Sequence, residues 1–249
     1  VLEYGSNIKY PRYVIPAPDG RTVYVIVTSA DPLSQGEGAG RLDVYARDPG
    51  SGRLTFVEIW DTSGPEQLRQ ATRAAVSPDS RHVYVACLAG NTQTGLTNGS
   101  IAFFESNEGT GGLDFKAVYG QSLGSASDLG VLRFSPDGTQ LILSRSATAK
   151  EFVVYDRDEP TGTLTWNMSY RGTDTGFGAC DDACVSFDGS KIVYTATGST
   201  PSLGFVGVLN RFPGSGRLEY VTRLLPQTGD GVTPSNPSSV VFSPMGEHL

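Results

Sequence analysis

Apolar and polar residues alternate along short runs of this chain, and one such run returns four times. Its apolar positions are every second residue: Val23, Val25 and Val27, then Val83, Val85 and Cys87, then Leu141 and Leu143, then Ile192, Tyr194 and Ala196. An alternation with a period of two is typical of β-strands. A turn rich in Pro, Asp and Gly precedes each run, and it favours a hairpin because Pro presets φ and Gly accepts positive φ. The pattern therefore predicts four β-hairpins.

Each repeat begins with a short apolar run before the first turn, and the alternating run after that turn is the second. Two further apolar runs, with a second Gly-rich turn between them, complete the repeat. The third runs begin at Leu42, Ile101, Phe152 and Val206, and the fourth runs at Leu54, Leu113, Leu164 and Leu218. The first turn recurs at positions 18, 78, 136, 187 and 244, at spacings of 60, 58, 51 and 57 residues. Four strands in about 40–60 residues are typical of a β-propeller blade. A β-sandwich is the alternative, but it does not require the same four-strand order to return four times.

The repeats predict one all-β domain over residues 1–249, a β-propeller of four-stranded antiparallel blades. Four complete blades are expected at about 8–60, 69–119, 126–170 and 180–224, with flanking partial strands at 1–6 and 238–249. A propeller protects its strand edges by closing its ring. We therefore expect the propeller to be incomplete within this chain.

The aspartates of the recurring first turn occupy equivalent positions in all four repeats. They are Asp19, Asp79, Asp137 and Asp188. Such a set resembles a repeated binding site, but an Asp in a tight turn commonly accepts hydrogen bonds from its own backbone. We expect these residues to form the turns.

Charge and hydropathy exclude two classes of partner. The net charge is −7 and no basic stripe is present, so nucleic-acid binding is not expected. No apolar run reaches the roughly 18 residues that a membrane-spanning helix needs.

Two glycosylation sequons begin at Asn98 and Asn167. Together with the low Lys content, they indicate a secreted or cell-surface protein, with the periplasm as the alternative.

The repeated elements resemble a known family. The P-D-G-x-x-V-Y-V element at Pro18–Val25 and the D-x-x-S-G-x-L element at Asp48–Leu54 are similar to repeats of lactonase-like seven-bladed propellers. These include the 6-phosphogluconolactonase type and its muconate-cyclase relatives, and the V-Y-V-A element at Val83 also resembles the YVTN repeats of surface-layer propellers. The resemblance covers nearly the whole chain. It implies the fold, whereas propellers host many unrelated activities.

The histidines that the resemblance implies are missing. Lactonase-type enzymes usually carry His residues leading into the first strand of a blade, with an Arg and an acid near the central channel. The matching segments begin at Lys9, Arg69, Ser127, Cys180 and Ser235, and none contains His. The two histidines of the chain, His82 and His248, follow hairpin turns at the other edge of a blade. No catalytic residue is therefore expected at the matching positions.

Three arginines and three aspartates are the candidate ligand groups. Arg12, Arg73 and Arg133 lie on expected first strands, where they would hold an anionic ligand in the channel unless they pair with neighbouring acids. Asp181 and Asp182, with Asp128 across the channel, offer the oxygens that Ca²⁺ prefers, but solvated loop acids or turn caps are the favoured interpretation. No other cofactor is expected.

The sequence C-D-D-A-C places Cys180 four residues before Cys184. Extended backbone would set their Cα atoms about 13 Å apart, which is too far for a disulfide. A disulfide between them is expected only if the two aspartates form a turn. Cys87 falls at an inward position of a predicted strand and is expected to be a small core residue.

The favoured function is a non-catalytic extracellular binding or structural propeller that acts through its variable loops. The segments 28–40 and 89–98 are long and 147–150 is short, whereas the opposite turns keep one pattern. Variable loops on a rigid scaffold are where binding usually occurs. A protein or glycan partner, or self-association through open blade edges, is expected. A lactone hydrolase or cycloisomerase is the alternative, and a self-assembling surface or filament component is a further one.

Overall fold

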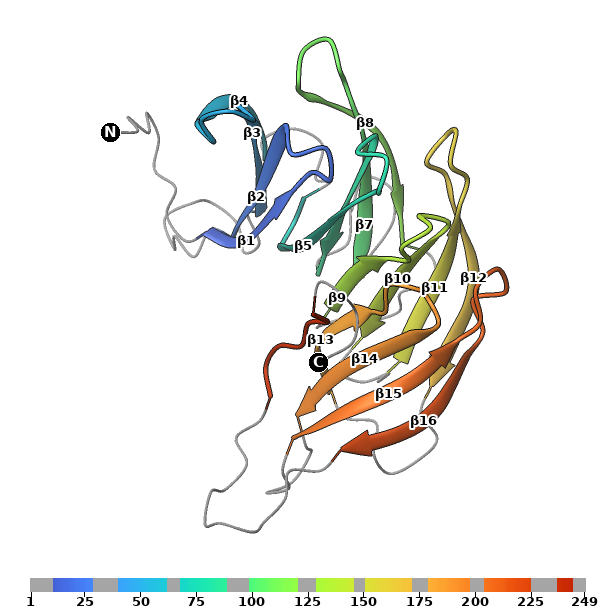
Figure 1. The fold of residues 1–249 in the computed structure, drawn as a ribbon. Coiled ribbons are helices and arrows are strands. Elements are labelled where there is room, and N and C mark those ends of the chain that lie inside the picture. The colour runs from blue at the N-terminus through green and yellow to red at the C-terminus, as the bar shows by residue number, and fades with distance from the viewer. Residues whose placement is uncertain are drawn as a thin grey trace, which may run out of the picture. The chain divides into compact units, whose positions relative to one another are not determined.

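The computed structural model describes residues 11–28, 40–61, 68–88, 99–120, 129–145, 151–171, 179–197, 204–224 and 237–243. Within these ranges the structure contains four antiparallel sheets of four strands each (Figure 1). No helix in the described part of the chain is long and apolar enough to cross a membrane. The prediction of four complete four-stranded units is confirmed.

Each sheet follows chain order, so neighbours in sequence are neighbours in the sheet. The strands are β1 (Pro11–Pro16), β2 (Thr22–Thr28), β3 (Gly40–Arg47) and β4 (Leu54–Trp60); β5 (Ala71–Val76), β6 (His82–Cys87), β7 (Ser100–Ser106) and β8 (Leu113–Tyr119); β9 (Leu129–Phe134), β10 (Gln140–Arg145), β11 (Glu151–Arg157) and β12 (Leu164–Arg171); β13 (Ala179–Val185), β14 (Lys191–Thr197), β15 (Phe205–Arg211) and β16 (Leu218–Leu224). The chain divides into two compact units, Val1–Ala126 and Ser127–Leu249, with two sheets in each.

The first unit buries its core between its two sheets. Tyr24, Ile26 and Leu42 of the first sheet share one apolar cluster with residues of the second sheet. The Trp60 ring packs edge-on against the Phe104 ring, with centroids 5.1 Å apart. Such an aromatic contact adds to the free energy gained by burying apolar area.

The second unit has an equivalent core between its third and fourth sheets. Val154 and Ile192 belong to one buried cluster there, and the Phe152 ring meets the Tyr194 ring edge-on at 5.5 Å. Gly207 on β15 makes this packing possible, because an added Cβ would lie 2.2 Å from Cζ of Tyr194. A side chain at position 207 would therefore displace the tyrosine.

The recurring first turn is held by its own side chains. Ser135 Oγ donates to Asp137 Oδ1 at 2.5 Å, and the same oxygen accepts the Thr139 N–H at 3.1 Å. Asp188 accepts in the same way from Ser186 and Ser190. The expectation that these aspartates form the turns is confirmed.

Three sheets add an arginine to this turn. The Nη1 atoms of Arg47, Arg157 and Arg211 donate to the carbonyl oxygens of Gly20, Gly138 and Gly189, at 3.0, 3.1 and 2.8 Å respectively. Each arginine ends the third strand of its sheet, and each glycine has a φ near 70°. The second sheet has Ser106 and Ser80 at these two positions, so it lacks the contact.

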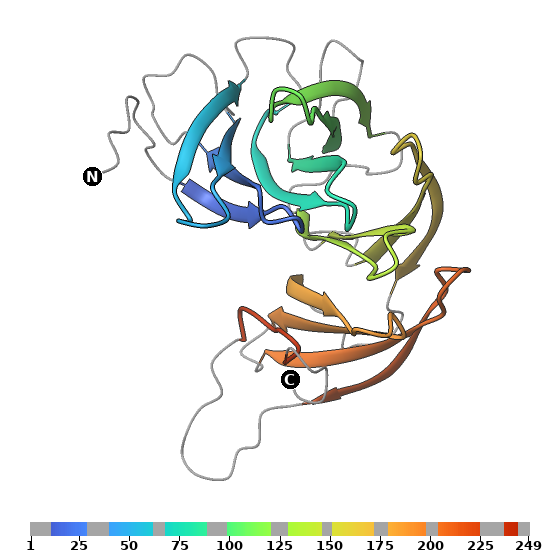
Figure 2. The same cartoon turned by 45° about the horizontal axis from the view of Figure 1, so that its top comes forward.

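The segment 237–243 lies beside β13, as the dark red ribbon in Figure 2 shows. It forms no regular strand, and Ser239 and Val240 contact β13 through the Asp182 side chain. The expected partial strand at 1–6 and residues 244–249 lie outside the described residues.

Candidate functional site

The first strands of the sheets carry the charged residues that the sequence singled out. In a β-propeller the first strand of each blade faces the central channel. Arg12 lies on β1, Arg73 on β5 and Arg133 on β9, whereas Asp181 and Asp182 lie on β13. The loops predicted to form the working face lie outside the described residues, at 29–39, 89–98 and 146–150. Asp128 and Asn98 also lie outside them.

Asp182 uses both of its carboxylate oxygens. Oδ1 accepts the Ala183 N–H at 3.0 Å and lies 3.5 Å from Nη2 of Arg133 on the neighbouring strand β9. Oδ2 accepts the Ser239 hydroxyl at 2.8 Å and the Val240 N–H at 3.2 Å. The carboxylate therefore ties the segment 237–243 to β13, which is a structural use of this acid.

The arginines have different surroundings in the two units. In the first unit the Arg73 guanidinium lies 5.5 Å from the centroid of the Tyr13 ring, and its Nη1 donates to the Thr72 carbonyl at 3.0 Å. Arg12 is exposed on β1. In the second unit Arg133 pairs with Asp182, which is the alternative that the sequence left open for it. Anion binding by these three residues stays a prediction.

The structure contradicts a disulfide between Cys180 and Cys184, because both are free cysteines. Asp181 and Asp182 belong to β13, so the turn that a bridge requires is not formed there. Burial raises the pKa of Cys180 to about 12 and that of Cys184 to about 11. Both thiols are therefore protonated and weakly nucleophilic at neutral pH. Cys87 is fully buried in the core, as its strand position predicts.

Calcium binding by the three aspartates stays a prediction. No group of three or more His, Cys, Asp or Glu side chains within the described ranges is arranged to hold a metal ion. Asp182 already accepts from donors on both oxygens, so a cation would have to displace Ser239 and Val240 to use Oδ2.

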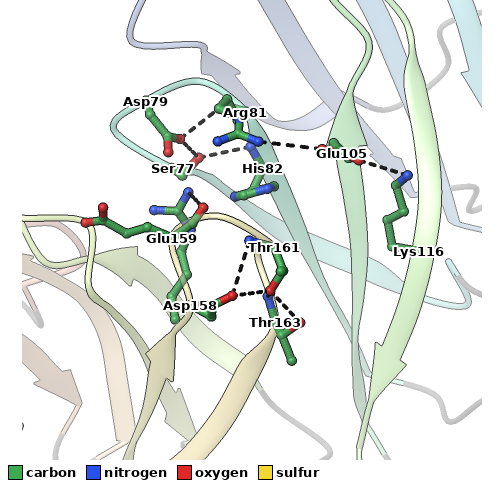
Figure 3. Close-up of polar contacts among 11 residues, drawn as sticks. Ser77, Asp79, Arg81, His82, Glu105, Lys116, Asp158, Glu159, Thr161 and Thr163 are labelled. Atoms are coloured by element: carbon green, nitrogen blue, oxygen red, sulfur yellow. Dashed lines mark hydrogen bonds and ion pairs between the residues drawn. The ribbon is translucent and has the colours of Figure 1, made fainter.

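His82 is buried at the start of β6, beside the turn that precedes it. Its backbone N–H donates to Ser77 Oγ at 2.9 Å, and its ring lies edge-on to Phe103, with centroids 5.4 Å apart. Figure 3 shows this turn and, on the next two strands, the ion pair of 2.8 Å between Glu105 and Lys116. The residue packs as a core side chain next to a structural turn.

The second sequon falls on the third sheet. Asn167 donates from Nδ2 to Asp156 at 2.8 and 2.9 Å and to the Ser215 carbonyl at 3.2 Å. A glycan would replace one of the two hydrogens on this nitrogen, so at least one of these contacts would be lost. The geometry thus opposes glycosylation at Asn167 in the folded protein.

The third sheet carries an ionic triplet that was not predicted from the sequence. Arg145 and Arg171 each contact one oxygen of Glu151, and Glu151 is almost fully buried. The signal was the charge of Arg145 and Glu151 at the ends of two apolar runs, where the other repeats have at most one charged residue in this pair.

No protein-family model and no curated protein matches this sequence. Solved structures do match. A putative 6-phosphogluconolactonase from Bacteroides uniformis is 16% identical with a TM-score of 0.58, and the match covers 95% of this chain and 76% of that one. The periplasmic gluconolactonase of Pseudomonas aeruginosa is 20% identical with a TM-score of 0.53, over 95% and 76% of the two chains.

A third match is a propeller in complex with a peptide. Chaetomium thermophilum Sqt1, bound to the N-terminus of a ribosomal protein, is 14% identical with a TM-score of 0.58. The match covers 92% of this chain and 51% of Sqt1. Likeness at such low identity establishes a shared fold. The chain is therefore a β-propeller with the fold of the 6-phosphogluconolactonase-like proteins.

Proposed function

We propose that this chain is a non-catalytic binding propeller that recognises a protein partner through its variable loops, outside the cell or in the periplasm. The observation that carries the proposal is the structural use of Asp182. Its two oxygens accept from Ala183, Ser239 and Val240 and pair with Arg133. An acid so engaged is poorly placed to exchange protons with a substrate.

The cysteines and arginines on the described first strands have unsuitable protonation chemistry. A general acid or base works best with a pKa near the operating pH. Burial raises the pKa of Cys180 to about 12 and that of Cys184 to about 11, and guanidinium groups do not lose their proton. Arginines on these strands can bind and orient a ligand, but they cannot relay protons at neutral pH.

The loops and two structural likenesses support the proposed partner and location. The loops of unequal length are mounted on sheets whose opposite turns are fixed by repeated contacts, an arrangement that suits recognition. The likeness to Sqt1 in complex with a ribosomal protein peptide supports a protein partner, and the likeness to a periplasmic gluconolactonase supports a location outside the cytoplasm.

Lactone hydrolysis is the second candidate function. The likeness to the Bacteroides uniformis and Pseudomonas aeruginosa proteins favours it. In that case Arg133, which is partly exposed on β9, would hold the anionic part of the substrate.

Lactone turnover separates the two functions. The protein is incubated with glucono-δ-lactone and with 6-phosphogluconolactone, and the acid released is followed against a buffer blank. A binding propeller leaves the rate at that of the blank. Turnover that is lost in Arg133→Met but kept in Arg53→Met, which changes an exposed turn residue, would establish the lactonase and overturn the proposal.

A further inference from the structure

Three charged residues form one row across the third sheet. Arg145 on β10 is the register partner of Glu151 on β11, and Glu151 is the register partner of Arg171 on β12. Oε1 of Glu151 accepts from Nη1 of Arg145, and Oε2 accepts from Nε of Arg171 at 2.6 Å. The row carries two positive charges and one negative charge.

The burial of this row costs free energy. The Glu151 side chain is 2% exposed and that of Arg145 is 9% exposed, whereas that of Arg171 is 68% exposed. Removing charges from water is expensive, and a buried ion pair is often no more stabilising than apolar residues of similar volume. The row therefore needs an explanation other than stability.

The repeats show that the fold does not need this row. The positions equivalent to Arg145 and Glu151 hold Val27 with Arg41, Cys87 with Ser100, and Ala196 with Phe205 in the other three sheets. Each of these sheets forms the same four-stranded arrangement. The paired charges are thus specific to the third sheet.

Both arginines keep donors that Glu151 does not use. Nε of Arg145 is buried and has no hydrogen-bond partner among the described residues. Arg171 contacts Glu151 only through Nε, so its two Nη nitrogens are left to bind a ligand from an exposed side chain. Glu151 has both oxygens occupied, so it does not compete for these donors. A buried donor without an acceptor is unfavourable, and a bound acceptor removes that penalty.

We propose that Arg145 and Arg171, held in place by Glu151, form a binding site for a carboxylate or phosphate group. The guanidinium fork matches both anions in shape and charge. Arg171 contacts the anion through its two Nη nitrogens, Nε of Arg145, unpartnered among the described residues, supplies a second donor, and Glu151 is a positioning residue. The site lies where β10 ends and β11 begins, at the end of the sheet to which the proposed function assigns binding.

Titration calorimetry at low ionic strength tests this site with two probes, inorganic phosphate and succinate. We expect at least one probe to bind, and Arg171→Gln to weaken its affinity about tenfold or more, because hydrogen bonds to charged groups are strong. Tighter binding of phosphate identifies a phosphorylated ligand, and tighter binding of succinate identifies a carboxylate ligand. Either result supports the site.

Arg217→Gln is the matched control, because Arg217 is also exposed and also pairs with a glutamate, Glu219, at 2.5 Å. It should leave the affinity unchanged. The proposal is overturned if neither probe binds at millimolar concentration, or if Arg171→Gln binds as the unaltered protein does. The melting temperature of Arg171→Gln is measured as well, because the substitution removes a partner of the buried Glu151, and binding is compared at a temperature where both proteins are folded. The readout is binding, so it stands or fails independently of lactone turnover.

Discussion

Arg211 on β15 donates two hydrogen bonds to Gln140 on β10, from Nε at 3.2 Å and from Nη2 at 2.6 Å. Its third group, Nη1, donates to the Gly189 carbonyl at 2.8 Å. Gln140 in turn donates to Asp156 at 2.8 Å. A single side chain, 2% exposed, thus joins the third and fourth sheets of the second unit and fixes a turn.

Replacing Arg211 should destabilise the second unit strongly. Arg211→Met leaves Oε1 of Gln140 and the Gly189 carbonyl without their donor, and the free energy of unfolding should fall by about 2–4 kcal/mol. Urea unfolding measures this change. Arg47→Met is the control: Arg47 makes the equivalent contact with Gly20 at 3.0 Å, and it should cost only about 1 kcal/mol. Equal losses in the two variants would show that the link to Gln140 contributes nothing.

Gly207 should tolerate no side chain while Tyr194 is present. An added Cβ would lie 2.2 Å from Cζ of Tyr194, so Gly207→Ala should lower the free energy of unfolding by about 1–3 kcal/mol. The same change in a Tyr194→Val background should cost much less, because the clash is gone. Gly50→Ala, where the nearest atom is 3.5 Å away, is the neutral control. Additive losses in the double variant would contradict the clash.

Much of the fold follows from the sequence because the period of two fixes which residues face inward. The third runs were predicted as well. The contact that Arg47, Arg157 or Arg211 makes with a turn glycine was not, because it joins positions about 20–30 residues apart. Each fourth strand also has a bulge that the alternation did not predict. In β4, for example, the register shifts where Glu58 and Phe56 pair with Val44 and Tyr45 of β3.

The candidate site was predicted less well than the fold. The sequence predicted Arg133 on a first strand and Asp182 at the channel, but it contained no sign that Asp182 would bind the segment that contains Ser239. The Arg145–Glu151 pair was not predicted for a related reason, because strand register decides that these two residues face each other. Side-chain partners on different strands depend on tertiary structure that local pattern does not encode.

The turn aspartate Asp188 should make stability depend on acid pH. The hydrogen bond from Ser186 Oγ, together with those from the Ser190 N–H and hydroxyl, lowers the pKa of Asp188 from 3.8 to about 2. A carboxyl whose pKa is lower in the folded state stabilises the fold above its unfolded pKa. That stabilisation is lost as the pH falls from about 4 to 2.

The pH dependence of unfolding tests this expectation. Between pH 4 and 2 the free energy of unfolding should fall less steeply in Asp188→Asn than in the unaltered protein, because asparagine does not titrate. Ser186→Ala should have an intermediate slope, since it removes the largest cause of the shift. Identical slopes for all three proteins would show that the turn does not shift the pKa of this carboxyl.

All three cysteines should be free thiols in the purified protein. Once the protein is unfolded, they should react with an alkylating reagent without prior reduction. Iodoacetamide in denaturant without reductant should therefore add three labels by intact mass. In the folded protein at neutral pH, burial and a pKa raised to about 12 should protect Cys87 and Cys180 from the reagent. One label in denaturant, with two more only after reduction, would show that two of the cysteines form a disulfide.

Asp182 is a structural acid that holds the segment 237–243 against β13. Hydrogen exchange in Asp182→Ala tests it most directly, with Ser239→Ala as the variant that removes one partner only. We expect faster exchange of the Val240 amide in Asp182→Ala, because its acceptor at 3.2 Å is gone, and a smaller effect in Ser239→Ala. Unchanged exchange of the Val240 amide in Asp182→Ala would show that the carboxylate does not hold this segment and would leave it available to a ligand such as Ca²⁺.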